Sequence, residues 1–158
     1  MLGYKYKFKS VGKTFQKSFE EVVEISVPPI GIRTPMQLDE TGSGLLLMNY
    51  GNVEQIADNL RNLLMTNHGE RLGLYRFGAN LRPLTTDYSS REDFDGEAIN
   101  RIRNAVSTWM PYIELEDFES NFDRYNNVST AIINIRITYN IPSINAFNQK
   151  IQVNLYVI

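Results

Sequence analysis

Residues 52–71 read NVEQIADNLRNLLMTNHGER, and they predict an amphipathic helix that ends in a polar turn. Asn52 is a favourable N-cap, and Gln55 stands three residues later at the capping-box position. Gly69 takes a positive φ at little cost and is the natural C-cap, so the helix is expected over residues 53–67. The apolar residues keep the i, i+3, i+4, i+7 spacing of one helix face: Val53, Ile56, Ala57, Leu60, Leu63 and Leu64.

A second helix is expected over residues 95–109, after a polar loop at residues 85–93. Between the helices, residues 70–84 are expected to form two short extended pieces that turn at Gly73 and Gly78. The apolar face of the second helix consists of Ala98, Ile99, Ile102, Val106 and Trp109.

The last third of the chain predicts an antiparallel sheet. Residues 131–139 alternate apolar and polar side chains, as a half-buried strand does. Residues 113–122 change the phase of this alternation, which indicates a β-bulge near Asp117. A loop is expected at residues 142–148. The predicted fold class is α+β, with two amphipathic helices packed on a small antiparallel sheet and an extended N-terminal arm.

The terminal strand also alternates, and its apolar residues are Ile151, Val153, Leu155 and Val157. Each would stabilise the fold by about 1.5–3 kcal/mol if buried. A terminal strand often lies at a sheet edge, where it can accept a strand from another chain. A place in the middle of the sheet fits the pattern equally well.

The charge of the chain is divided unevenly. Its 158 residues carry a net charge of -2, but residues 1–17 hold five lysines and no acid, a charge of +5. The other 141 residues hold 11 Lys or Arg and all 18 acids, a charge of -7. The lysines alternate with Tyr4, Tyr6 and Phe8, which are candidate anchors on a partner protein. A solvated tail is the alternative.

Three regions follow from these patterns. Residues 1–28 form the basic and aromatic N-terminal arm, with a strand-like stretch at residues 22–27. Residues 29–51 form a lead-in segment, irregular because of its prolines and glycines, with a short strand within residues 45–50. Residues 52–158 form the core domain.

Several chemistries are excluded by composition. The chain has no Cys, which excludes thiol catalysis, disulfides and Cys-type metal sites. The single His68 excludes a His-rich metal site and is expected to be solvated or to cap a helix. No apolar run approaches the ~20 residues of a membrane span, and no secretion signal is recognised, so a cytoplasmic origin is expected.

Glycoside hydrolysis is the enzymatic alternative. It needs two carboxylates, one of them with a raised pKa. Glu70 with Asp87 or Asp93 would provide such a pair, although the neighbouring Arg71 would lower the pKa of Glu70.

The stretch from Leu63 to Arg71, followed by Phe-Gly-Ala-Asn-Leu at residues 77–81, resembles the core motif of the contractile-tail baseplate wedge family. That family includes the sheath-attachment wedge subunit of T-even-like phages and the corresponding subunit of type VI secretion baseplates, and some members are labelled lysozyme-like. The resemblance covers about residues 52–158, and residues 29–35 are similar to the lead-in of phage members. The residues that carry the motif are Gly69, Glu70, Arg71, Phe77 and Gly78.

The resemblance implies a structural subunit rather than an enzyme. Family members often have Glu-Pro-Arg after the second helix, at a place implicated in docking to other wedge subunits. This chain has Met110-Pro111-Tyr112, so the proline is kept and both charges are absent. Pro111 and Tyr112 are therefore expected near the wedge contact, and Glu70 with Arg71 is expected to join an ion-pair network after the first helix.

The expected function is a baseplate wedge subunit of a contractile phage tail that links the wedge to the tail sheath and templates the first sheath ring through residues 150–158. Its expected partners are other wedge subunits and the sheath subunit, with several copies around the tail axis. The expected location is the virion tail baseplate, assembled in the host cytoplasm. No cofactor, metal, nucleic acid or membrane is expected as a partner. The alternatives are a peptidoglycan-cleaving hydrolase of a phage baseplate and a nucleic-acid accessory protein that uses residues 1–17.

Overall fold

The structure is a computed structural model, and it describes residues 27–39, 44–87, 90–124 and 131–157. Residues 1–26 of the predicted arm, with Tyr4, Tyr6 and Phe8, lie outside the described residues, as does nearly all of the strand predicted at residues 22–27.

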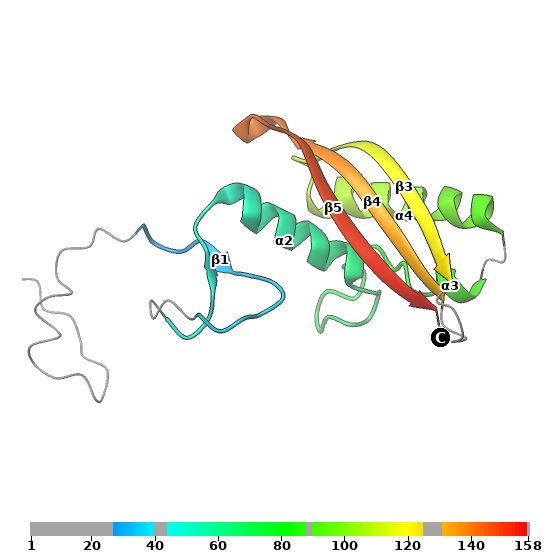
Figure 1. The fold of residues 1–158 in the computed structure, drawn as a ribbon, viewed down its shortest axis with the longest axis horizontal. Helices are drawn as coiled ribbons and strands as arrows, with labels where there is room; N and C mark the ends of the chain where they lie inside the picture. The colour runs from blue at the N-terminus through cyan, green and yellow to red at the C-terminus, as the bar shows by residue number, and fades with distance from the viewer. Residues whose placement is uncertain (1–26, 40–43, 88–89, 125–130, 158) are drawn as a thin grey trace, which may run out of the picture.

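The described residues confirm an α+β fold (Figure 1). Two long helices, α2 and α4, accompany a three-stranded antiparallel sheet of order β3-β4-β5. The elements are β1 Gly31–Ile32, β2 Met48–Asn49, α2 Asn52–Met65, α3 Leu84–Asp87, α4 Arg91–Trp109, β3 Glu114–Arg124, β4 Ala131–Ile141, the 3-10 helix η2 Pro142–Ile144 and β5 Ala146–Val157.

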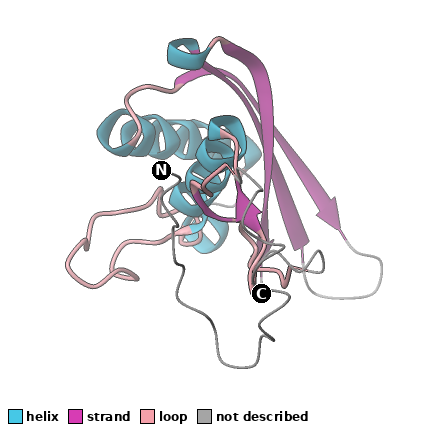
Figure 2. Cartoon of the chain, turned by 90° about the vertical axis from the view of Figure 1, so that its left-hand side faces the viewer, coloured by secondary structure: helices cyan, strands magenta, loops and turns pink. Residues whose placement is uncertain are grey.

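Both long helices lie on the same side of the sheet (Figure 2). The central strand β4 directs every second side chain at them, from Ile133 to Ile141, and all of these are buried. The opposite face of the sheet carries exposed polar side chains such as Arg136, Gln152 and Asn154. The period-2 alternation of the sequence therefore becomes one apolar and one polar sheet face.

Helix α2 begins one residue earlier than predicted, and both of its caps differ from the prediction. The N-cap is Gly51, without a side-chain cap bond, so the prediction of Asn52 as the cap is wrong by one residue. At the other end, Thr66 leaves the helical conformation and its hydroxyl donates to the Asn62 carbonyl at 2.6 Å. The helix therefore ends at Met65, and Gly69 is not its C-cap. Gly69 does have a positive φ of 87°, within the loop that follows.

Helix α4 begins at Arg91, four residues earlier than predicted. Its N-cap is Ser90, whose hydroxyl accepts from the Asp93 N–H at 3.2 Å and donates to the Asp93 carboxylate at 2.8 Å. This reciprocal cap makes the acidic stretch helical and buries Phe94 in the core. The predicted polar loop is further shortened by α3, whose Leu84 is buried.

Residues 66–80, called the motif loop below, contain turns and no strand. The prediction of two extended pieces is therefore wrong. The turns are closed by backbone hydrogen bonds such as Leu74 N to Arg71 O at 3.3 Å and Phe77 N to Leu74 O at 2.9 Å. The predicted reversals at Gly73 and Gly78 are confirmed, with φ values of 80° and 113°.

The sheet confirms the predicted bulge. The pairing of β3 with β4 shifts between Leu115 and Asp117, which leaves Glu116 as the extra residue. The loop predicted at residues 142–148 is shorter than expected, because η2 and the left-handed Asn145 reverse the chain within four residues.

The lead-in segment, residues 29–51, lies at the N-terminal end of α2 (Figure 1). Much of it is irregular, and β1 pairs antiparallel with β2. Ile30 N donates to Asn49 O at 2.8 Å, and Arg33 N donates to Leu47 O at 3.0 Å. The short strand predicted within residues 45–50 is thus confirmed as β2.

Candidate docking surfaces

The motif loop is closed at its base by Gly78. With a φ of 113°, a Cβ at this position would overlap the backbone carbonyl oxygen of Thr66. The loop thereby returns to the end of α2, where Ala79 N donates to Leu63 O at 2.9 Å. Only glycine fits both the backbone conformation and the close approach.

Glu70 stabilises the loop from within. Its two carboxylate oxygens accept from the backbone N–H and the side-chain amide of Asn67, each at 2.8 Å. These hydrogen bonds, with a smaller contribution from the Arg82 charge, lower the pKa of Glu70 below its ordinary value. The expected ion-pair network of Glu70 with Arg71 is not among the salt bridges of the described residues.

Arg71 instead contacts an aromatic ring. Its guanidinium carbon lies 3.7 Å from the centroid of the Phe77 ring, a cation–π contact. Phe77 in turn packs edge-on against Trp109, with ring centroids 5.2 Å apart and planes at 61°. Two motif residues thus attach the loop to the C-terminal end of α4.

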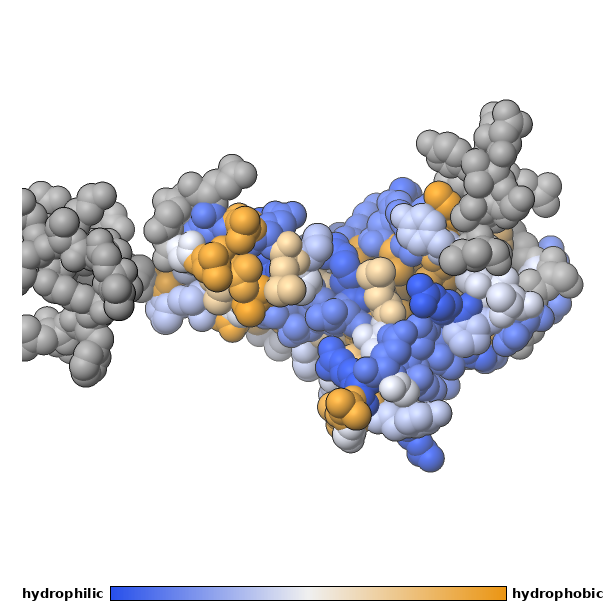
Figure 3. All heavy atoms as spheres, turned by 90° about the horizontal axis from the view of Figure 1, so that it is seen from below, coloured by the Kyte–Doolittle hydropathy of each residue, from blue (hydrophilic) through white to orange (hydrophobic). Residues whose placement is uncertain are grey.

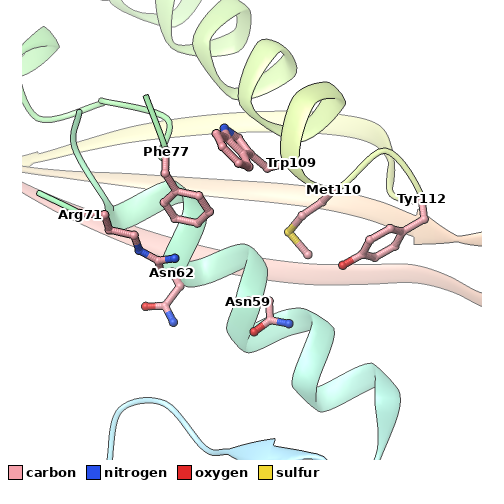
Figure 4. Close-up of a pocket in the computed structure, with 7 residues that line it drawn as sticks. All are labelled: Asn59, Asn62, Arg71, Phe77, Trp109, Met110 and Tyr112. Carbon is pink, nitrogen blue, oxygen red and sulfur yellow. The ribbon is translucent and has the colours of Figure 1, made fainter. Parts of the chain in front are cut away.

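These side chains line a shallow groove of about 210 Å³ between α2 and the end of α4. Figure 4 shows Arg71 and Phe77 at one end and Tyr112 at the other, with Met110 between them. Tyr112 is 43% exposed, and its partial burial raises the pKa of its hydroxyl. Pro111 is exposed beside it, in the turn closed by Ile113 N and Met110 O. The structure therefore brings Arg71 and Phe77 onto the same surface as Tyr112.

The terminal strand β5 lies at an edge of the sheet. Ile151, Val153 and Leu155 face the helices and are buried in the core of the chain itself. Val157 ends the strand opposite Ala131. Among the described strands β5 pairs with β4 alone. A partner strand on its open side would therefore bind the backbone of β5 and not these buried side chains. A hollow of about 130 Å³ beside the strand is lined by Leu64, Met65, Asn67, Glu70, Arg82, Asn154, Leu155 and Tyr156.

A polar cluster that no sequence pattern indicated holds the lead-in segment on α2. Asp58 lies on the side of α2 away from its apolar face, yet it is only 6% exposed. Its Oδ2 accepts from Thr34 N at 2.9 Å and from the Asn49 amide at 2.8 Å, and its Oδ1 pairs with Arg61 at 3.0 Å. Burial alone would raise the pKa of Asp58, but these hydrogen bonds and the Arg61 charge lower it below the ordinary value. Periodicity cannot reveal such a residue, because its partners are distant in sequence.

Two exposed apolar areas lie outside the core. One covers the lead-in segment and the other the end of the motif loop (Figure 3). In the motif loop, Leu72 is fully exposed, Tyr75 is largely exposed and Leu74 is about half exposed. The exposed large hydrophobic residues of the lead-in segment are Ile30, Ile32, Met36, Leu38, Leu45 and Tyr50. Apolar areas of this kind are typical of surfaces that contact other proteins.

The environment of Glu70 does not favour its candidate role as a general acid. A general acid needs a raised pKa, whereas that of Glu70 is lowered. Asp93 is engaged by the Ser90 cap. Over the described ranges, no group of three or more His, Asp or Glu side chains could hold a metal ion. No helix in this part of the chain is long and apolar enough to cross a membrane.

Comparisons with known proteins agree with this fold. Residues 51–146 match the family model described as baseplate wedge protein gp25. A crystal structure from Geobacter sulfurreducens that carries the name tail lysozyme is 23% identical, with a TM-score of 0.51 over 70% of this chain and 94% of that one. The cryo-EM structure of the anti-feeding prophage baseplate contains a chain that is 21% identical, with a TM-score of 0.54 over 70% and 82%. No curated protein matches.

Proposed function

The chain belongs to the baseplate wedge protein gp25 family, and we propose that it links the wedge of a contractile-tail baseplate to the tail sheath. Membership makes it a baseplate wedge-like, tail-associated protein that acts in several copies with other baseplate components. The proposal adds two specific contacts, one through β5 and one through the groove at Tyr112. It also places the copies around the tail axis of a phage virion whose parts are assembled in the host cytoplasm.

The open edge of β5 supports the sheath contact. The strand is 12 residues long, and Lys150 is its only charged residue. Its apolar side chains are already used in the core, so a sheath segment would be bound through the backbone as a fourth strand. Strand addition of this kind would template the first sheath ring.

Deletion of residues 150–158 is unsuitable as a test, because it removes core residues. Gln152 and Asn154 are both exposed on β5, so replacing them with Lys leaves the core intact. Lysines on an edge strand discourage the addition of another strand. We expect baseplates with the Gln152→Lys/Asn154→Lys variant to assemble but to carry no stable sheath in electron micrographs. Asn100→Lys, exposed on α4, is the control and keeps normal sheath. Normal sheath on the doubly substituted baseplates would disprove the contact.

The groove at Tyr112 supports the wedge contact. It contains the exposed Tyr112 ring and the Arg71 guanidinium. The sequence Met110-Pro111-Tyr112 has no charge, and Arg71 provides a positive charge on the same surface. Aromatic and Arg side chains are the commonest anchors of protein interfaces. Tyr112→Ala is expected to reduce incorporation of the chain into wedges by at least roughly tenfold, while Asn100→Ala, exposed on α4, serves as the control. Unchanged incorporation would contradict this placement.

We propose that this role involves no catalytic step. The Geobacter sulfurreducens structure is named a tail lysozyme, so a hydrolase is the alternative function. The lowered pKa of Glu70 argues against it, because a general acid must be protonated at the working pH. Purified protein is expected to release no soluble fragments from peptidoglycan. Release that disappears in Glu70→Gln would establish the hydrolase instead.

A further inference from the structure

The two edges of the sheet differ sharply in charge. The β5 edge has Lys150 alone, whereas β3 at the other edge carries four acids between Glu114 and Glu119. Among the described strands β3 pairs only with β4, so this edge too has an open side. Because of these acids, the β3 edge suits a partner strand with basic side chains, unlike the β5 edge.

The acids of β3 are concentrated on the polar face of the sheet. The register places Glu114, Asp117 and Glu119 opposite Asn140, Thr138 and Arg136 of β4. We call these three acids the acidic row. Among the described residues, an ion pair joins Glu119 of this row to Arg136 at 3.3 Å, and both side chains are at least half exposed. The row therefore keeps an excess of negative charge beside the open edge.

The other face of the same edge is apolar and partly open. Leu115, Phe118 and Phe122 lie opposite the buried Tyr139, Ile137 and Ile133. Phe118 packs on the core from the rim, and Phe122 is 40% exposed although its ring contacts Phe94 at 5.6 Å. An added strand would need apolar, preferably aromatic, side chains on this face and cations on the other.

One segment of the chain has this alternation. Residues 4–9 read Tyr-Lys-Tyr-Lys-Phe-Lys, with aromatics at even and lysines at odd positions. In an extended conformation they would direct three aromatic side chains to one face and three lysines to the other. Placed about 4.8 Å from β3, the lysines would lie beside the acidic row and the rings beside Phe118 and Phe122.

We infer that the open edge of β3 binds residues 4–9 of a second copy of this chain as an added strand. The arm and the edge lie on every copy, so the contact joins neighbouring copies head to tail. It is independent of the sheath contact, because it uses the opposite edge of the sheet.

A charge exchange tests this inference with full-length protein. One variant reverses the arm (Lys5→Glu, Lys7→Glu and Lys9→Glu), and the other reverses the edge (Glu114→Lys and Glu119→Lys). Asp117 is left intact because its carboxylate accepts from Phe118 N at the bulge. The control variant reverses two exposed acids on the helices, Glu54→Lys and Glu92→Lys, with folding of all variants checked by circular dichroism.

Sedimentation of the unchanged chain is expected to show association that weakens at least about tenfold between roughly 50 and 500 mM salt. Each reversed variant alone should lose this association, and the control variant should keep it. An equal mixture of the two reversed variants should regain it, since each reversed arm then meets an edge of opposite charge. A chain that stays monomeric at low salt, or a mixture that fails to associate, would overturn the inference.

The absence of Cys allows a direct check of the position. Chains with Lys7→Cys and Asn121→Cys should form a mixed disulfide under mild oxidation, because Asn121 is exposed on the same face as the acidic row. Chains with Lys7→Cys and Asn154→Cys, on the β5 edge, should not. The reverse result would place the arm elsewhere.

Discussion

The backbone N–H of Thr34 donates a 2.9 Å hydrogen bond to the carboxylate of Asp58, 24 residues later in the chain. The same oxygen accepts from the Asn49 amide, so one carboxylate joins both sides of the β1–β2 pair to α2. The lead-in segment is thereby attached to the core domain although many of its apolar side chains remain exposed.

Asp58→Ala is expected to detach the lead-in segment. It leaves the Thr34 N–H without this acceptor and leaves the Asn49 amide with Gln55 Oε1 at 3.3 Å, at a cost of about 1–3 kcal/mol. Hydrogen exchange should become faster in residues 30–34 and 47–49, with little change in the sheet. Glu54→Ala, exposed on the same helix, is the control. Equal protection of the lead-in segment in both variants would refute the assignment.

The lowered pKa of Asp58 predicts that the attachment of the lead-in segment weakens in acid. Its folded pKa lies below the ordinary value of 3.8, so its stabilising contribution is complete above that value and is lost as the pH falls through the folded pKa. The exchange protection of the lead-in segment should therefore fall in acid in the unchanged chain. In Asp58→Asn this acid-dependent loss should be smaller, since no carboxylate titrates there.

Gly78→Ala is expected to destabilise the chain by about 1–3 kcal/mol, since it forces a side chain into a positive φ. The overlap with the Thr66 carbonyl adds to this cost. Gly96→Ala is the matched comparison, because Gly96 lies within α4 and a Cβ there meets nothing within 4 Å. It should stabilise by roughly 0.5–1 kcal/mol. Denaturant unfolding measures both, and effects of the same sign would contradict the geometry.

The contact of Phe77 with Trp109 is accessible to fluorescence, because Trp109 is the only tryptophan. Phe77→Leu should shift its emission to longer wavelength and cost about 0.5–1.5 kcal/mol beyond the lost burial. Arg71→Ala should cost less, about 0.5–1 kcal/mol, as expected for an exposed cation–π contact. An unchanged spectrum in Phe77→Leu would show that the loop does not pack on α4.

Glu70→Ala is expected to loosen the motif loop, because Asn67 loses both of its carboxylate contacts. Hydrogen exchange of residues 67–77 should increase at neutral pH. In the unchanged chain the same loosening should appear as the pH falls through the lowered pKa of Glu70, and not above its ordinary value of 4.5. Glu92→Ala is the control, and a loop equally protected in both variants would contradict this role.

Local sequence patterns determined most of the architecture. The 3.6-residue spacing of α2 and the period-2 alternation of β4 each require one buried face, which fixes helix, strand and the α+β class. The bulge near Asp117 was predictable because a change of phase in an alternating strand needs an extra residue. The turns at Gly73 and Gly78 follow from the conformational freedom of glycine.

Tertiary structure alone decided the arrangement of the surfaces. The Ser90 cap of α4 and the end of α2 at Thr66 are local contacts over three and four residues, which apolar periodicity does not report. The burial of Asp58 depends on donors brought from 9 and 24 residues away. Arg71 and Tyr112 share one groove only because α2 and α4 pack together. Local patterns specify which face of an element is buried, whereas contacts between distant residues exist only once the chain has closed on itself.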